Sequence, residues 1–158
     1  MIKILFVCHG NICRSPMAEF IFRDLVQKAG RGDAYHIASA ATSTEEIWGD
    51  VGNPVYPPAR DELLRHGLRC DGKRAVQVKK SDYDKYDMFV VMDTNNVRNI
   101  MRIFGQDKEN KVHKLMDFTP QGGDVADPWY SRNFKTAYDD IEHGCKCLLK
   151  YLEENENG

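Results

Sequence analysis

The chain opens with a short, strongly apolar run that ends at Cys8. Six of its first eight residues are bulky and apolar, which is typical of a strand buried on both faces of a parallel sheet. Gly10 and Asn11 interrupt the pattern, and both residue types accept positive φ. Ser15 and Pro16 then fit a helix N-cap and a first helical residue. The pattern therefore predicts a buried strand, a tight loop and a helix in immediate succession.

Strand-like and helix-like segments alternate along the rest of the chain. Apolar residues recur at helical spacing from Met17 to Ala29, and Gly30 ends that helix. The alternation predicts an α/β fold with a mainly parallel sheet, in which ligands bind beyond the carboxyl ends of the strands. The remaining predicted segments are strands at 35–41, 86–92 and 111–116, helices at 58–66, 94–104 (capped by Asp93) and around 138–152, long loops at 42–55 and 117–132, and a frayed tail at 153–158.

Length and charge exclude several classes of protein. A chain of 158 residues suits a single domain spanning 1–158. Its 22 Lys and Arg nearly balance 24 Asp and Glu, and a net charge of −2 gives no support for nucleic-acid binding or for docking to anionic lipid. The apolar runs are too short to span a bilayer and the N-terminus does not read as a secretory signal. We therefore expect a cytoplasmic protein with neither a nucleic-acid nor a membrane partner.

The loop after the first strand carries the residue types that bind and attack a phosphate. Cys8 ends the strand and Arg14 opens the helix, with five residues between them. A loop that winds into a helix start directs backbone N–H groups inward and makes an anion nest. The planar fork of Arg14 holds two phosphate oxygens at once, while the nest and the Ser15 hydroxyl favour the thiolate form of Cys8. This arrangement predicts a nucleophile beneath a bound phosphorus.

A purely structural interpretation of the same residues stays open at this point. Cys8 and Cys13 are small enough to be ordinary buried side chains, and Arg14 can pair with a surface carboxylate. A Cys and an Arg at this spacing are weak evidence by themselves, because short motifs arise by chance. The strand–loop–helix setting is what favours the catalytic interpretation.

A second candidate lies in the long loop near the C-terminus, at Asp127. Asp127 precedes Pro128, and such pairs are common in turns, where aromatic residues often fix a loop. Cleavage of a phosphate ester, however, needs an acid that protonates the leaving oxygen. A carboxyl group on a loop at the cavity rim can do this, and the aromatic neighbours Trp129 and Tyr130 would favour its protonated form. Once deprotonated, the same group can activate water.

These motifs resemble the low-molecular-weight protein-tyrosine phosphatases. The segment Val-Cys-x-Gly-Asn-x-Cys-Arg-Ser-Pro follows an N-terminal strand, and Asp127-Pro128 lies near the C-terminus, so the resemblance covers nearly the whole chain. It implies a three-layer domain with a four-stranded parallel sheet, a phosphate loop from Cys8 to Arg14, Asp127 as general acid, and no metal. The sequence departs at Trp129, where the family commonly has Tyr. This puts in doubt regulation through two adjacent phosphorylated tyrosines, although Tyr130 remains.

The resemblance also implies roles for residues around the loop. It makes Ile12 and Trp48 candidates for the cleft walls, and it groups Asn11, Ser39 and His66 in a polar network that holds Asn11 in a left-handed conformation. Trp48 packing on the core, and ordinary loop, strand-end and helix-end roles for the other three, are the alternatives. Together with the catalytic set Cys8, Arg14 and Asp127, the expected substrate- and phosphate-binding residues are His9, Gly10, Asn11, Ile12, Cys13, Ser15, Trp48, Trp129 and Tyr130.

The other cysteines and histidines do not form a recognisable metal site. The five cysteines are an odd number, which in a cytosolic chain favours reactive or buried thiols over a disulfide framework. Cys13 is either a small apolar filler or a partner that forms a disulfide with Cys8 under oxidant. Cys145 lies on the apolar stripe of the last helix, and its spacing from Cys147 is wrong for a zinc knuckle. We expect neither a metal nor another cofactor.

We therefore predict a cysteine-dependent hydrolase that acts on phosphotyrosine proteins and small aryl phosphates. A phosphocysteine would form on Cys8, Asp127 would act as general acid and then base, and inorganic phosphate would be released by a monomer or weak dimer. One alternative is a thiol-dependent arsenate reductase on the same fold, which would need further redox cysteines on a mobile segment. The other is a phosphotyrosine- or anion-binding module without catalysis.

Overall fold

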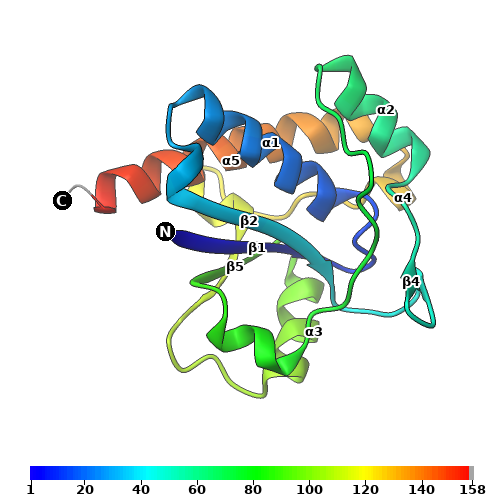
Figure 1. Cartoon of the computed structure of the whole chain (residues 1–158), viewed down its shortest axis with the longest axis horizontal. Helices are drawn as coiled ribbons and strands as arrows, with labels where there is room; N and C mark the ends of the chain where they lie inside the picture. The colour runs from blue at the N-terminus through cyan, green and yellow to red at the C-terminus, as the bar shows by residue number, and fades with distance from the viewer. Residues whose placement is uncertain (157–158) are drawn as a thin grey trace.

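A four-stranded parallel sheet forms the centre of the protein. The computed structural model describes residues 1–156, and its strands lie in the order β2 (Tyr35–Ala41), β1 (Ile2–Cys8), β5 (Met88–Val91) and β6 (Val112–Lys114). All three pairings are parallel (Figure 1). The predicted strand at 35–41 has the observed bounds, and the other strands begin and end within two residues of their predicted bounds.

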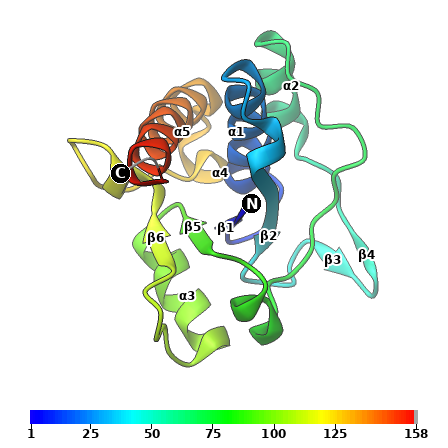
Figure 2. The same ribbon diagram turned by 60° about the vertical axis from the view of Figure 1, so that its left-hand side comes forward.

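Helices cover both faces of this sheet, which confirms the expected three-layer α/β architecture. Helices α1 (Arg14–Lys28), α2 (Pro57–Arg65) and α5 (Phe134–Glu156) pack together on one face, and α3 (Thr94–Phe104) covers the other (Figure 2). Among the described residues, no helix is long and apolar enough to cross a membrane.

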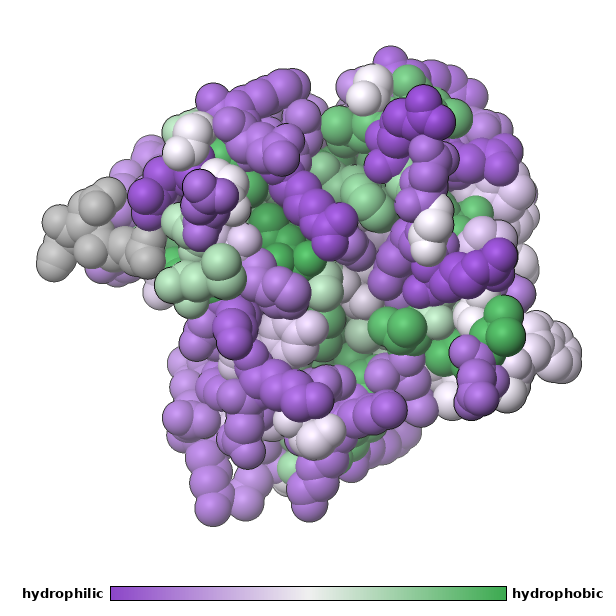
Figure 3. Space-filling view, viewed as in Figure 1, coloured by the Kyte–Doolittle hydropathy of each residue, from purple (hydrophilic) through white to green (hydrophobic). Residues whose placement is uncertain are grey.

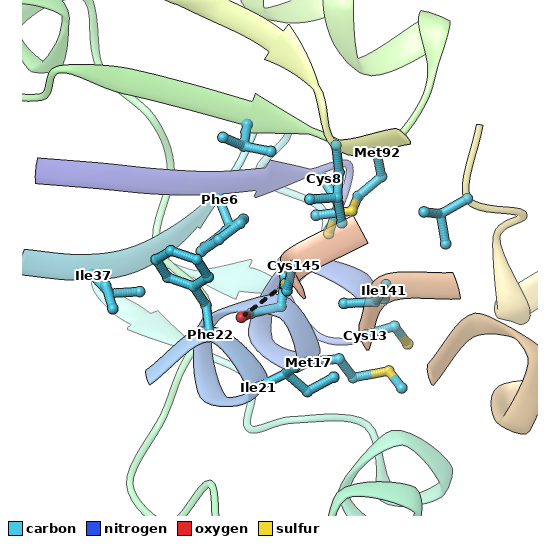
Figure 4. Packing of buried hydrophobic residues seen from close by; sticks show 14 of the residues in the cluster. Phe6, Cys8, Cys13, Met17, Ile21, Phe22, Ile37, Met92, Ile141 and Cys145 are labelled. Atoms are coloured by element: carbon cyan, nitrogen blue, oxygen red, sulfur yellow. Dashed lines mark hydrogen bonds between the residues drawn. The ribbon is translucent and has the colours of Figure 1, made fainter. Parts of the chain in front are cut away.

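The alternation of side chains along β1 divides the apolar core between the two faces. Ile4 and Phe6 belong to the core beneath α1 and α5, whereas Leu5 and Val7 belong to the core beneath α3. Cys8 continues the first series and is buried at the end of β1, where Figure 4 shows it close to Met92. The central strand is apolar because both of its faces are covered.

Two predicted loops contain short elements. Residues 42–55 include a hairpin of β3 (Ile47–Trp48) and β4 (Val51–Gly52). Gly49, which lies between these strands with a φ of 62°, was a local turn signal that the prediction missed. The remaining short helices are η1 (Gly32–Ala34), η2 (Lys80–Asp84), η3 (Leu115–Phe118) and α4 (Pro128–Ser131).

The prediction that the chain frays from residue 153 is wrong as far as the structure describes it. Helix α5 continues to Glu156. Glu153 accepts hydrogen bonds from Arg31 Nε at 2.8 Å and from the Tyr35 hydroxyl at 2.9 Å. These contacts attach the last turns of α5 to the start of β2, which the polar composition of the segment did not reveal. Residues 157–158 of the predicted tail lie outside the described residues.

The sheet topology determines where a ligand can bind. The chain leaves β1 through α1 and enters β2 on one side, while β5 pairs with β1 on its other side. The carboxyl ends of β1 and β5 therefore frame a crevice where the connections diverge, which is the usual ligand site of such sheets. Cys8 is the last residue of β1, and Asp93 lies just after the end of β5, so both are at this crevice.

Candidate active site

Cys8 lies at the bottom of the loop that joins β1 to α1. Its side chain is buried, and its Sγ lies 3.0 Å from the Ser15 hydroxyl oxygen. The Ser15 backbone N–H, in the first turn of α1, also donates to the sulfur over 3.4 Å. Asn11 has a φ of 60°, so the loop makes the left-handed turn that its sequence predicts. The thiol group thus faces the start of a helix, where the macrodipole favours negative charge.

The carbonyl groups of this loop are bonded to neighbouring segments. Among the described residues, no side chain caps the first turn of α1, whose N-cap is Cys13. Carbonyls that are bonded to the surrounding protein, together with an uncapped helix start, suit a loop that receives an anion. The bonded pairs are Thr42 N to Cys8 O, Ser43 N to His9 O, and Tyr56 N to Ile12 O, at 2.9, 3.1 and 2.9 Å.

A buried polar network supports the loop from behind. The Asn11 Nδ2 group donates to the hydroxyls of Ser15 at 2.8 Å and Ser39 at 3.0 Å, and its Oδ1 accepts from Val76 N at 3.1 Å. The Ser39 hydroxyl donates to Glu19 Oε1 at 2.5 Å. Because a carboxylate only accepts, the Ser39 hydroxyl gives its proton to Glu19 and accepts from Asn11, while the Val76 N–H sets the orientation of the Asn11 amide. The Ser15 hydroxyl accepts from Asn11, so its own proton is directed to the Cys8 sulfur or, more weakly, to Ala40 O at 3.5 Å.

His66 does not belong to this network, contrary to the sequence-based expectation. Its ring stacks on Tyr138 with centroids 3.8 Å apart and bonds to Glu62 at 3.1 Å. Lys73 reaches the network instead, donating to Ser39 O at 2.9 Å and lying 3.8 Å from Glu19. Burial lowers the pKa of Lys73, and the nearby Glu19 opposes this change. The segment of Lys73 is remote in sequence from the loop, so the sequence alone carried no signal for this contact.

Arg14 is almost completely buried and connects three segments of the chain. Its Nη1 donates to Asp93 Oδ2 at 2.7 Å and to Val125 O at 2.9 Å, while its Nη2 lies 3.6 Å from Asp127 Oδ2. Burial lowers the pKa of the guanidinium, but Cys8 and Asp93 outweigh burial and raise it above its ordinary value. From the sequence, Asp93 is predicted only as a helix cap. It does cap α3, accepting from Asn96 N at 2.7 Å, and it orients Arg14 as well.

Asp127 is the N-cap of the short helix α4, which places its carboxylate beside Arg14. Its Oδ1 accepts the Trp129 N–H at 3.0 Å, and about 29% of its side chain is exposed. The Trp129 ring packs against Tyr56, with centroids 4.9 Å apart. Arg132, at the end of α4, donates to the Tyr56 hydroxyl and lies over its ring. Asp127 is therefore held by its hydrogen bond to the Trp129 N–H and by the packing of Trp129 on Tyr56, on a segment otherwise exposed to solvent.

These groups surround an open cavity of about 140 Å³. The cavity brings together nine of the predicted residues, and it adds Glu45 and Glu46, which looked like part of a polar loop. The other predicted residues, Asn11, Ser15 and Trp48, are not among the described residues that line the cavity. Asn11 and Ser15 are buried, and Trp48 is 74% exposed on the hairpin. The lining consists of Cys8, His9, Gly10, Ile12, Cys13, Arg14, Glu45, Glu46, Asp127, Trp129 and Tyr130.

Cys13 differs from Cys8 in its surroundings. Burial, with smaller contributions from Cys8 and Asp127, strongly raises the pKa of Cys13, so it remains a neutral thiol. Both cysteines are free. Among the described residues, no three His, Cys, Asp or Glu side chains are placed to hold a metal ion together.

The family and the curated relatives that this chain resembles in sequence are low molecular weight phosphotyrosine phosphatases. The profile of the family described as low molecular weight phosphotyrosine protein phosphatase matches residues 3–157. The chain is 37% identical to the low molecular weight protein-tyrosine-phosphatase YfkJ of Bacillus subtilis, over 99% of both chains. It is 38% identical to the low molecular weight phosphotyrosine protein phosphatase of Gallus gallus, over 94% of both chains. The crystal structure of YfkJ matches with a TM-score of 0.90, covering 98% of this chain and 96% of that one.

Proposed function

This chain belongs to the low molecular weight phosphotyrosine protein phosphatase family, and from that premise we propose that its hydrolase reaction proceeds through Cys8, Arg14 and Asp127. The observation that supports this assignment most directly is the shared cavity. The Cys8 sulfur is bonded to Ser15 at its floor, Arg14 lies beside it, and Asp127 stands 3.6 Å from Arg14 at the rim. Nucleophile, anion clamp and acid are thus within reach of one bound phosphate.

Substrate binding uses the loop and the free edge of Arg14. Asp93 and Val125 occupy Nη1 of the guanidinium, so Nη2 remains for the equatorial oxygens of the phosphate, together with the loop N–H groups. Ile12, Trp129 and Tyr130 line the wall above them and suit the face of an aryl ring. Because Cys8 is only 3% exposed, the phosphate must be carried on an arm that reaches the floor, which favours phosphotyrosine.

The reaction takes two steps. The Cys8 thiolate attacks phosphorus and forms an S–P bond as the ester P–O bond breaks, and protonated Asp127 gives its proton to the leaving phenol oxygen. Asp127, now a carboxylate, takes a proton from water, whose oxygen attacks the phosphocysteine. The S–P bond breaks, inorganic phosphate leaves, and the thiolate is restored. The Ser15 hydroxyl stabilises that thiolate at both stages, and its 3.0 Å contact with the sulfur is already in place.

Trapping the covalent intermediate tests this assignment. The protein is mixed with a phosphotyrosine peptide, quenched rapidly, digested and analysed by mass spectrometry. We expect one phosphoryl group on the peptide that contains Cys8. In Cys8→Ser the turnover should fall by roughly 10⁴-fold or more. Its melting temperature, and the increase of that temperature on adding inorganic phosphate, should stay close to those of the wild-type protein. Cys147→Ser, which changes a thiol on α5, serves as the matched control and should keep both turnover and trapping.

Two outcomes would contradict the proposal. One is turnover that persists in Cys8→Ser, and the other is a phosphoryl group on a different residue. Thiol-dependent reduction of arsenate without phosphatase turnover would favour the reductase instead. Phosphotyrosine binding without hydrolysis would favour the binding module. The cytoplasmic location and the monomeric or weakly dimeric state stay predictions.

A further inference from the structure

Two carboxylates stand at the mouth of a cavity whose floor accepts an anion. Glu45 and Glu46 line the cavity beside the phosphate loop. Glu45 Oε2 lies 2.9 Å from His9 Nε2, and Glu46 Oε2 accepts from Asn53 Nδ2 at 2.7 Å. Neither residue has a role in the chemistry proposed above. Negative charge here opposes binding of a phosphate dianion, so the carboxylates need an explanation other than phosphate binding.

The segment that carries these carboxylates is fixed to the phosphate loop. The Ser43 N–H and hydroxyl both bond to His9 O, at 3.1 and 2.9 Å. Asn53 N donates to Glu46 O at 2.8 Å, which closes the segment on the other side. The Glu46 side chain also lies directly over Gly10, where a Cβ atom would be only 3.3 Å from its Cγ. The two charges are therefore held at a defined place relative to the bound phosphate.

The negative charge at the mouth is only partly compensated. The Glu46 partner is a neutral amide, which orients the carboxylate without cancelling its charge. Among the described residues, the ion-pair partner of Glu45 is His9 alone, which is charged only when protonated, and about 70% of the Glu45 side chain is exposed. Arg132, also near the mouth, packs its guanidinium over the rings of Tyr56 and Phe134. The field of Glu46 extends into the loop, where it contributes to the raised pKa of Cys13.

The hairpin beside these carboxylates offers an apolar contact. Trp48 and Val51 face each other across β3 and β4, and they are 74% and 59% exposed. The hairpin stands out from the body of the protein in Figure 2, and the same edge of the surface in Figure 3 mixes apolar and polar residues. An extended peptide that leaves the cavity over this edge would meet the carboxylates first and the apolar pair next.

We propose that Glu45 and Glu46 are specificity-determining residues that select phosphotyrosine segments with Lys or Arg beside the phosphotyrosine. A cation on the substrate pairs with the carboxylates and removes the repulsion that a bare aryl phosphate experiences. This inference rests on the proposed function, since it needs a phosphotyrosine in the cavity. The carboxylates thus weaken the binding of small anionic esters and of acidic segments, while the loop and Arg14 bind the phosphate group of every substrate in the same way.

Three matched phosphopeptides test this selectivity. They share one sequence, with the residues on both sides of phosphotyrosine set to Lys, Gln or Glu. Exposed ion pairs change an equilibrium by roughly 1.4- to 5-fold each. With two carboxylates we expect kcat/KM for the Lys peptide to exceed that for the Glu peptide by roughly 10-fold at low salt. In about 0.5 M NaCl the difference should shrink strongly, because exposed charges are screened.

Variants connect the preference to the two residues. In the double variant Glu45→Gln/Glu46→Gln the Lys-to-Glu ratio should fall to about 2-fold or less, and kcat/KM for p-nitrophenyl phosphate should rise. The control Glu154→Gln removes the same charge near the far end of α5 and should keep the wild-type ratio. Glutamine at position 46 can still accept the Asn53 hydrogen bond, and hydrolysis of p-nitrophenyl phosphate shows that the double variant is folded.

The outcomes separate this inference from the function on which it rests. Equal kcat/KM for all three peptides in the wild-type protein, or a preference for Lys that survives in the double variant, would overturn the selection by Glu45 and Glu46 and leave the phosphatase assignment intact. Failure to hydrolyse any peptide or p-nitrophenyl phosphate would instead overturn the proposed function, and the inference with it.

Discussion

The floor and the mouth of the cavity border the same space, but the protein holds them in different ways. At the floor, Asn11, Ser15, Ser39 and Glu19 are each at most 3% exposed and bond to one another. At the mouth, exposed side chains such as Tyr130 and Glu45 are carried on the single turn α4 and on the segment just before the hairpin β3–β4. Buried polar groups must be satisfied and so tolerate little change, whereas an exposed rim tolerates much more. This difference predicts that the chemistry depends on the floor and the choice of substrate on the mouth.

Asp127 tests this division, because it is a mouth residue for which we propose a chemical role. In Asp127→Asn we expect kcat/KM, which reports the first step, to fall by roughly 10²- to 10³-fold for phenyl phosphate and by less than about 10-fold for p-nitrophenyl phosphate, since p-nitrophenolate leaves without a proton. Asparagine keeps the Oδ1 acceptor that caps α4 at Trp129 N, so the loop should remain in place. Measuring kcat/KM over a series of aryl phosphates with increasingly acidic phenols checks this. An equal loss on all esters would contradict the role of Asp127 as acid.

A substitution at Glu19 tests whether the buried network at the floor affects the chemistry. In Glu19→Gln the charge-assisted bond from the Ser39 hydroxyl becomes a weaker neutral one, which loosens Ser39 and, through it, the Asn11 side chain that holds Ser15 with its proton toward Cys8. We expect kcat to fall by about 10-fold, which is the size of effect expected for one hydrogen bond to a charged group, with KM changed little. Alkylation of Cys8 by iodoacetate at neutral pH, located by mass spectrometry, should slow in parallel.

Glu62→Gln is the matched control for this prediction. Glu62 is also a buried helical carboxylate, and it pairs with Arg65 and His66 away from the loop. Both variants should lower the melting temperature, because each removes a buried charge from its partners. Only Glu19→Gln should lower kcat and the alkylation rate. A loss of kcat as large in Glu62→Gln would show that Glu19 acts through general stability alone.

Substitutions at Tyr56 have the smallest expected effect, and they test which contacts hold the loop of Asp127 at the mouth. Tyr56→Phe removes the hydroxyl that Arg132 bonds to at 3.3 Å but keeps the ring against Trp129. We expect kcat for phenyl phosphate to change by less than about 2-fold, whereas Tyr56→Ala should lower it by roughly 2- to 10-fold through loss of the aromatic pair. If the Phe variant were as impaired as the Ala variant, polar contacts rather than ring packing would hold the acid loop.

The sequence predicted best what is encoded locally. The apolar run before Cys8 and the turn residues specified the strand, loop and helix in order, and all three are present, although the helix begins at Arg14 with Cys13 as its N-cap and not with Ser15. Asp93 was likewise predicted as a helix cap from its position alone. These features depend on neighbours within a few residues, and single-sequence patterns report such neighbours.

What the sequence did not reveal consists of contacts between distant segments. Arg14 and Asp93 are 79 residues apart, and Asn11 bonds to Val76 across 65 residues. No local pattern distinguishes an Asp that only caps a helix from one that also orients an arginine. Glu45 and Glu46 looked like ordinary solvated charges because the fold, not the segment, places them beside the loop. His66 was assigned to the network by resemblance, but Lys73 lies there instead.

Arg14 gives the bound phosphate a mechanical role. The guanidinium joins the start of α1 to Asp93, between β5 and α3, and to Val125, in the loop before α4. An anion held on Arg14 therefore stabilises three separate segments of the chain. If inorganic phosphate, the product of the proposed reaction, binds the native state there, it should raise the melting temperature in proportion to RT ln(1 + [phosphate]/Kd). The dissociation constant that sets how strongly accumulated product slows turnover is therefore the same one that sets how far it protects the protein from heat.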